Sequence, residues 1–197
     1  MGVSMTESGD PVQMPGFLFD MNRFFQSLIS RFLHDELSEF SVQDEHRLKG
    51  IFEYDPKNNP QRRRTVVPRP DFALMANGKA IEFLDAKYRD LWERPLPRDM
   101  LYQLAIYALS KDAGPPRATI LYPTLVGNAV DQLMLLKDPI FGHKRAEITL
   151  RPVNLLKLER LLRPRQGTIV ARHRRQFARE LVFGSKPKIQ FNSLVVS

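Results

Sequence analysis

Apolar residues recur at three- and four-residue spacing over Phe17–Leu37, which predicts a helix with one broad buried face. Asp20 is placed to cap the first turn of this helix. The next two apolar stretches, Phe40–Val42 and Lys49–Tyr54, are short and predict strands. Asp55–Arg64 is polar and contains two prolines and an Asn-Asn pair, which predicts a loop.

A β-hairpin is the most strongly indicated element of the chain. Arg69–Met75 and Ala80–Tyr88 are both strand-like. Between them, Ala76–Lys79 contains Asn77-Gly78, the dipeptide most typical of a two-residue hairpin turn. The two strands are therefore expected to pair antiparallel.

A loop over Arg89–Pro97 is expected to precede a second helix. Asp99 is placed to cap this helix, which is expected to run to about Lys111 before Gly114-Pro115-Pro116 stops it. Its expected buried stripe consists of Leu101, Leu104, Ala105, Ala108 and Leu109.

The remaining elements alternate between strands and helices. Arg117–Val126 and Ala146–Pro152 predict strands, whereas Asp131–Leu136 fits either a strand or a short helix. Helices are expected over Val153–Leu162 and Thr168–Phe183, and an edge strand is expected over Lys188–Ser197.

This order of elements predicts an α/β fold, in which helices flank both faces of a mixed central sheet. No Pro-rich or Gly-rich linker divides the middle of the chain, so we expect one domain over residues 16–197, with a basic helical part at about 153–183. Residues 1–15 lack the basic and apolar regions of a secretory signal and are expected to be a flexible lead-in. No apolar run approaches the roughly 20 residues of a membrane span. With no export signal, we expect a cytoplasmic protein.

Composition and charge narrow the possible chemistry. The 197 residues include no cysteine, which excludes disulfides, thiolate zinc sites and iron–sulfur clusters. The net charge of +8 favours a polyanionic partner such as DNA. We expect two basic groups to contact phosphates, although solvated helix faces and a loop would look the same: Arg62, Arg63 and Arg64, and Arg172, Arg174, Arg175 and Arg179.

The predicted hairpin carries residues suited to phosphodiester hydrolysis. Asp71 and Asp85 stand on its two strands, where antiparallel pairing can bring them together. Two carboxylates are a sufficient protein contribution to a Mg²⁺ site, with the backbone carbonyl of Ala86 as a further ligand. Lys87 shares a face of its strand with Asp85, so its ammonium can stabilise charge that develops on a phosphate.

An Asp and a Lys two residues apart on a strand are also commonly a surface ion pair, worth under about 1 kcal/mol. The neighbouring residues argue against this reading. Asp85 and Lys87 interrupt a strongly apolar stretch that begins at Ala80, where charges without a function are uncommon.

These residues belong to a longer pattern, formed by Phe17–Asn22, Arg69–Leu74, Leu84–Tyr88, Leu101–Ala108 and Leu121–Pro123. The pattern resembles the nuclease domain of McrC-type proteins, the cleavage subunits of 5-methylcytosine-dependent McrBC restriction systems, which belong to the PD-(D/E)xK superfamily. The resemblance implies that the α/β fold has a restriction-endonuclease-like core. It further implies that Asp71 and Asp85 bind Mg²⁺, for which Mn²⁺ can substitute, and that Lys87 is catalytic. It also implies that Gln103, which follows Tyr102, is a further polar residue beside the site.

The sequence departs from this family in two places. The family's first helix usually carries a glutamate after its aromatic pair, where this chain has Gln26, which cannot supply a carboxylate charge. Family members also carry an N-terminal region that engages a GTP-hydrolysing motor subunit, whereas only about sixteen residues precede the matching helix here. We therefore expect this chain alone to dock poorly to a McrB-like motor.

The sequence thus predicts a magnesium-dependent DNA endonuclease of a restriction system. One active site cuts one strand, so cutting a duplex would need two copies, either as a homodimer or as two molecules meeting on DNA. Two alternatives stay open. One is a non-catalytic nucleic-acid-binding module, which Gln26 favours, and the other is a nuclease acting on RNA or branched DNA, which the motif does not distinguish.

Overall fold

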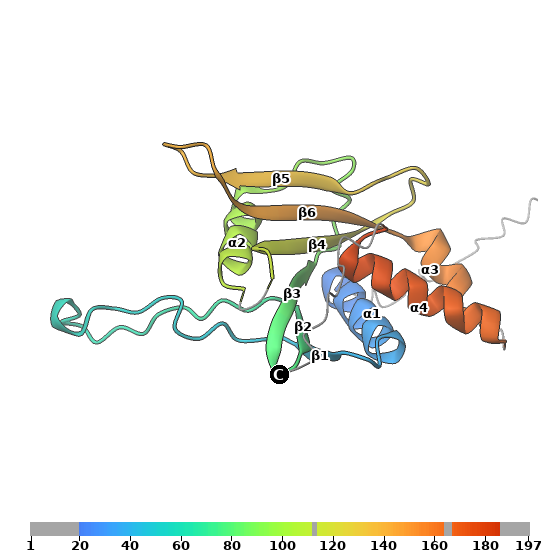
Figure 1. The fold of residues 1–197 in the computed structure, drawn as a ribbon, viewed down its shortest axis with the longest axis horizontal. Coiled ribbons are helices and arrows are strands. Elements are labelled where there is room, and N and C mark those ends of the chain that lie inside the picture. The colour runs from blue at the N-terminus through green and yellow to red at the C-terminus, as the bar shows by residue number, and fades with distance from the viewer. Residues whose placement is uncertain (1–19, 112–113, 164–166, 186–197) are drawn as a thin grey trace, which may run out of the picture.

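A computed structural model of the chain describes residues 20–111, 114–163 and 167–185, in which six strands form one mixed sheet between two layers of helices (Figure 1). In chain order the strands are β1 (Ser41–Asp44), β2 (Phe72–Ala76), β3 (Lys79–Ala86), β4 (Arg117–Thr124), β5 (Gln132–Lys137) and β6 (Lys144–Asn154). The helices are α1 (Met21–Glu36), the 3₁₀ turn η1 (Pro56–Asn58), α2 (Arg98–Leu109), α3 (Leu155–Leu162) and α4 (Thr168–Phe183). The α/β class predicted from the sequence is confirmed.

The β2–β3 hairpin forms as the Asn-Gly pair predicts. Asn77 and Gly78 both have positive φ, 50° and 73°, as a two-residue hairpin turn requires. The strands pair antiparallel with Phe72 opposite Leu84. From this hairpin the sheet extends in the order β1-β2-β3-β4-β6-β5, with β3, β4 and β6 parallel to one another and β1 and β5 antiparallel at the edges. The crossover between the parallel strands β3 and β4 contains α2.

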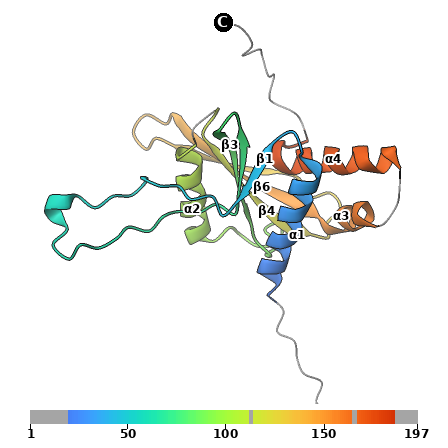
Figure 2. The same ribbon diagram turned by 90° about the horizontal axis from the view of Figure 1, so that it is seen from below.

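The helices cover both faces of the sheet and create two hydrophobic cores (Figures 1 and 2). Helices α1, α3 and α4 lie on one face, where Phe25, Ile29 and Leu158 pack with Leu84 and Leu121. Of the helices in the described ranges, α2 covers the other face, packing residues such as Leu104 and Tyr107 against the strands. Among the described residues, no helix has the length and apolar character needed to cross a membrane.

The predicted boundaries hold best where a local signal marks the end of an element. Asp20 caps α1 by accepting a hydrogen bond from the Arg23 amide, as predicted. Asp131–Leu136, which fitted a strand or a helix, is strand β5, and its residues are mostly exposed because β5 is an edge strand. The lead-in at residues 1–15 and the predicted edge strand at 188–197 lie outside the described residues.

Three predictions of local structure are wrong. Residues 49–54 form no strand, because this stretch stands away from the sheet and has no strand beside it to pair with. Asp99 does not cap α2, whose N-cap residue is Pro97. On α2, Leu109 is 57% exposed and Tyr107 is buried in its place, because the helix turns its Leu104–Tyr107 side toward β4 and β6.

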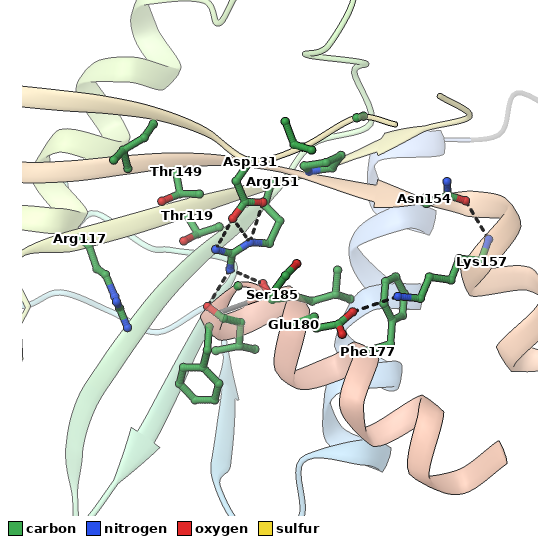
Figure 3. Close-up of a pocket in the computed structure, with 18 of the residues that line it drawn as sticks. Arg117, Thr119, Asp131, Thr149, Arg151, Asn154, Lys157, Phe177, Glu180 and Ser185 are labelled. Carbon is green, nitrogen blue, oxygen red and sulfur yellow. Dashed lines mark hydrogen bonds and ion pairs between the residues drawn. The ribbon is translucent and has the colours of Figure 1, made fainter. Parts of the chain in front are cut away.

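A buried arginine joins the end of α4 to the sheet, at a pocket of about 740 Å³ between β6 and α4 (Figure 3). Arg151 on β6 binds the Asp131 carboxylate through two nitrogens and donates to the carbonyl oxygens of Leu181 and Val182, at 3.0 and 2.9 Å. Gly184 follows with φ of 88°, and a Cβ there would lie 3.0 Å from the guanidinium. This pocket is therefore built around a structural clamp, and it does not include the predicted catalytic residues.

Replacing Arg151 with alanine is expected to lower the free energy of unfolding by roughly 2–4 kcal/mol, because two buried helix-end carbonyls lose their donor. The Asp131 carboxylate adds little to this loss, because its side chain is 40% exposed. Urea unfolding followed by circular dichroism measures this loss. The matched control is Arg145→Ala, which removes an exposed pair with Asp138 and should cost under about 1 kcal/mol. Equal effects of the two substitutions would contradict the clamp.

Candidate active site

The hairpin brings the two predicted carboxylates to the same end of the sheet. Asp71 immediately precedes β2, and the register that pairs Phe72 with Leu84 sets it opposite Asp85 in β3. Asp85 is only 3% exposed, although charged residues are rarely buried without a partner. Lys87 follows the end of β3, where its amide donates to the Leu121 carbonyl at 3.0 Å and its side chain is half-buried.

Asp71 is held in place from two directions. Its Oδ2 accepts a hydrogen bond of 2.8 Å from the Ala86 amide, which crosses from β3. Its Oδ1 accepts one of 3.0 Å from the Gln26 side-chain amide on α1. Each carboxylate oxygen has a second lone pair, so both remain able to accept from or coordinate a further group. Gln26, which the sequence marked as a departure from the family, thus contacts the predicted site directly.

The electrostatics show that this site carries excess negative charge. Burial, together with the neighbouring Asp71 carboxylate, raises the pKa of Asp85 to about 7, and the Lys87 ammonium only partly opposes the shift. Burial also raises the pKa of Asp71, against the hydrogen bond from Ala86 and the charge of Lys87. Two ionised carboxylates beside one ammonium leave a net charge of −1 in a largely buried place, which favours binding of a cation.

Gln103 reaches the site through a tyrosine that the sequence did not single out. The Gln103 amide donates to the Tyr107 hydroxyl, one turn further along α2. Tyr107 in turn donates to the backbone carbonyl of Arg69 at 2.6 Å, two residues before Asp71. The nearby charges of Asp85 and Asp71 contribute, after burial, to a Tyr107 pKa of about 12. Tyr107 and Gln103 therefore position the segment that carries Asp71, and the i, i+4 spacing on a helix is the signal that could have identified them.

Tyr102, the other residue of this predicted pair, points away from that network. Its side chain is 60% exposed on the opposite side of α2 from buried Leu104 and Tyr107. It is therefore available to a ligand, but it does not help to build the carboxylate site.

The donor set fits a magnesium ion better than a transition metal. Among the described residues, no cluster of three His, Cys, Asp or Glu side chains is suited to hold a metal. Magnesium does not need such a cluster, because it retains several waters and is commonly bound by one or two carboxylates together with substrate phosphate oxygens. Asp71, Asp85 and the Ala86 carbonyl thus remain a sufficient predicted set for Mg²⁺.

The predicted phosphate-binding arginines fall into two separate places. Arg62, Arg63 and Arg64 are exposed on the long excursion before β2, whereas the arginines of α4 lie at the other end of the molecule (Figures 1 and 2). On α4, Arg172 and Arg175 are exposed. Arg174 and Arg179 instead form ion pairs with Glu36 and Glu39 at the end of α1. We therefore assign these last two guanidiniums to helix packing.

Comparison with known proteins adds a family context to this geometry. The family model described as "McrBC 5-methylcytosine restriction system component" matches residues 1–123, which include the carboxylates, Lys87, Gln26 and Gln103. One similar solved structure is a refined half-complex from a tetradecameric assembly of Thermococcus gammatolerans McrB AAA+ hexamers with bound McrC. It has 21% sequence identity and a TM-score of 0.45, and the match covers 80% of this chain but 32% of the other. No curated protein matches the chain.

Proposed function

The chain belongs to the family of McrBC 5-methylcytosine restriction system components, and from this premise we propose that it is a magnesium-dependent DNA endonuclease of such a system. The observation that carries the proposal is the placement of Asp85, Asp71 and Lys87. Two carboxylates with raised pKa values lie beside one ammonium at the end of a hairpin. A structural ion pair would lower the pKa of the carboxylate, so this arrangement is better suited to receiving a cation and a phosphate.

Each residue of the site has a distinct task in this proposal. Asp71 and Asp85 hold the metal ion, and the Ala86 amide fixes the orientation of the Asp71 carboxylate. When bound, the ion polarises the phosphoryl oxygen and lowers the pKa of the attacking water. The Lys87 ammonium lies beside both carboxylates and stabilises the negative charge that grows on the phosphate during attack. Gln103 and Tyr107 anchor the backbone before Asp71, which keeps the carboxylate in register with β3.

Incubation of supercoiled plasmid with the purified chain tests the activity. Nicked or linear plasmid is expected with Mg²⁺ or Mn²⁺ and not with EDTA. A parallel panel of single-stranded DNA, RNA and branched DNA distinguishes the proposed substrate from the alternatives that share the same motif. Salt-sensitive DNA binding without cleavage at any metal or protein concentration would favour a non-catalytic binding module, the function that Gln26 favours.

The partners of this activity are also part of the proposal. The sequence alone suggested poor docking to a motor, but the chain belongs to a family of restriction system components. We therefore propose a McrB-like motor as a partner and the cytoplasm as the location. One site cuts one strand, so we propose that two copies act together on a duplex. Light scattering of the chain with and without duplex DNA distinguishes a stable dimer from two molecules that meet on DNA.

Gln26 offers a test of how the site tunes its metal affinity. Gln26→Glu places a third carboxylate beside Asp71, so we expect metal affinity to rise by roughly 10-fold or more and the metal-free protein to become less stable at pH 8. The concentration of Mg²⁺ giving half-maximal cleavage measures the gain. Ser27→Glu is the matched control, because it adds the same charge at the next residue on α1, where the side chain is exposed. A similar gain from Ser27→Glu would show that the effect is not local to Asp71.

A further inference from the structure

The most unusual feature of the fold is the excursion between β1 and β2. Residues 45–70, here called the arm, leave the sheet as two extended legs that meet at η1, far from the body of the molecule (Figures 1 and 2). Backbone hydrogen bonds join the legs only near the base, from the Glu45 amide to the Asp71 carbonyl and from the Leu48 amide to the Pro68 carbonyl. Loops of this length without strands or long helices are uncommon in compact domains and are usually functional.

The surface of the arm combines positive charge with exposed rings. Its residues include seven Lys or Arg and three Asp or Glu, a net charge of +4, which is half of the +8 carried by the whole chain. Phe52 and Tyr54 are 47% and 43% exposed, and Val66 is 82% exposed. Such a segment does not bury enough apolar surface to form a core of its own. It is well suited to a polyanion that also presents sugars and base edges, which is the chemistry of DNA.

The three successive arginines of the arm, Arg62 to Arg64, lie at a turn whose backbone is strained. Arg62 has φ of 50°, a conformation in which glycine would be more stable than arginine. The turn is held by Asn59, whose side chain accepts from the Arg63 amide and donates to the Arg63 carbonyl, both at 2.9 Å. The arginines are exposed, so nothing in the folding of the arm requires their side chains. The strain is therefore better explained by a function of the guanidinium than by stability.

The arm is anchored directly on the catalytic residues. Its second leg runs through Arg69 and Pro70 into Asp71, and the Tyr107 hydroxyl holds the Arg69 carbonyl at 2.6 Å. Arg62 and Asp71 are nine positions apart, so an extended leg sets the arginines up to roughly 30 Å from the carboxylates. DNA rises about 3.4 Å per base pair, so that reach corresponds to at most about 9 base pairs.

We propose that the arm lies along duplex DNA and that Arg62, Arg63 and Arg64 bind backbone phosphates several base pairs from the bond that the active site cuts. This inference rests on the proposed nuclease function, and it adds the element that holds the substrate. The charge of the arm favours DNA over a protein partner such as the motor or a second copy of the chain.

The test compares the full chain with the variant Arg62→Gln/Arg63→Gln/Arg64→Gln, using a 30-base-pair duplex in EDTA. Three lost phosphate contacts should reduce the slope of log Kd against log salt by about 2.7 and weaken binding on the order of 10²-fold at 0.15 M salt. The control variant Lys79→Gln/Lys137→Gln/Arg160→Gln removes the same charge from exposed positions elsewhere and should leave both quantities nearly unchanged. An unchanged slope in the arm variant, or an equal change in the control, would overturn the proposal.

Two further measurements separate this result from misfolding and from a protein-docking role. Arg62→Gly should bind duplex about 5-fold more weakly while its melting temperature stays the same or rises, because glycine relieves the positive φ. If the triple variant instead keeps its salt slope but changes the oligomeric state in light scattering, the arm docks a second copy and the proposal is wrong. Because DNA binding is measured without metal, this test is independent of cleavage. The arm proposal can therefore fail while cleavage is observed, and it can hold while no cleavage is observed.

Discussion

Replacing Asp85 with asparagine is expected to slow metal-dependent DNA cleavage on the order of 10³-fold or more. Asparagine keeps the shape of the side chain but removes one of the two charges that we propose bind the metal ion. A metal ion contributes several kcal/mol of charge stabilisation to phosphoryl transfer, and each 1.4 kcal/mol is about tenfold in rate. The initial rate of plasmid nicking at saturating Mg²⁺ measures the loss. DNA affinity in EDTA should stay the same or increase, because a negative charge is removed from the site.

Two further variants are compared with Asp85→Asn: Lys87→Met, which changes a second residue of the site, and Asp99→Asn, which is the surface control. Lys87→Met is also expected to slow cleavage strongly, although it removes a charge of the opposite sign, because in our proposal the ammonium acts on the phosphate and not on the metal. Asp99 is exposed in the first turn of α2, so its conversion to asparagine should leave the rate within about twofold. If Asp85→Asn cut plasmid at more than a tenth of the wild-type rate, the carboxylate could not be a metal ligand required for catalysis.

The second large effect of replacing Asp85 is on stability. The substitution that lowers activity is expected to raise the stability of the metal-free protein. In the metal-free protein, burial and the Asp71 charge raise the pKa of Asp85 to about 7, compared with about 3.9 in an unfolded chain. The folded protein therefore binds more protons than the unfolded chain between about pH 4 and pH 7, and the free energy of unfolding falls as the pH rises through that window. Above pH 7 the buried charge destabilises the fold by up to about 4 kcal/mol, at about 1.4 kcal/mol for each of roughly three pKa units.

Asp85→Asn removes that cost, so the variant should be more stable than the wild type by roughly 2–4 kcal/mol at pH 8 and nearly equal to it at pH 4. Urea unfolding in EDTA between these pH values measures the difference, with Asp99→Asn expected to show none. Adding Mg²⁺ should stabilise the wild type selectively, because the ion binds the folded state of that protein. A wild type that gains stability relative to Asp85→Asn as the pH rises would identify Asp85 as half of a structural ion pair with Lys87.

The parts of the fold that could be predicted are those decided by neighbouring residues. Asn77-Gly78 favours a hairpin turn through the conformations of these two residues themselves. That turn sets Asp71 opposite Asp85. Asp20 likewise caps α1 through the amide three residues later. The placement of the two carboxylates on the hairpin was therefore visible in the sequence, because it depends on one turn and on alternation along two strands.

The features that could not be predicted depend on residues far apart in the chain. The apolar residues 49–54 suggest a strand, but a strand also needs a neighbour, and the arm offers none. The pairing of Arg179 with Glu39 joins residues 140 positions apart, so sequence pattern alone could not separate this arginine from its exposed neighbours Arg172 and Arg175. The contact of Tyr107 with the Arg69 carbonyl has the same explanation, whereas its spacing from Gln103 on the helix was visible in the sequence.

The account depends most on the claim that Asp71 and Asp85 together hold a divalent ion. Titration of the wild-type chain and Asp85→Asn with Mn²⁺ at pH 8, followed by electron paramagnetic resonance, tests this claim without requiring cleavage. One bound ion is expected for the wild type and for Lys87→Met, and binding at least about 10-fold weaker for Asp85→Asn. Equal binding by the wild type and Asp85→Asn, or none by the wild type at millimolar Mn²⁺, would contradict the assignment of the two carboxylates as a metal site.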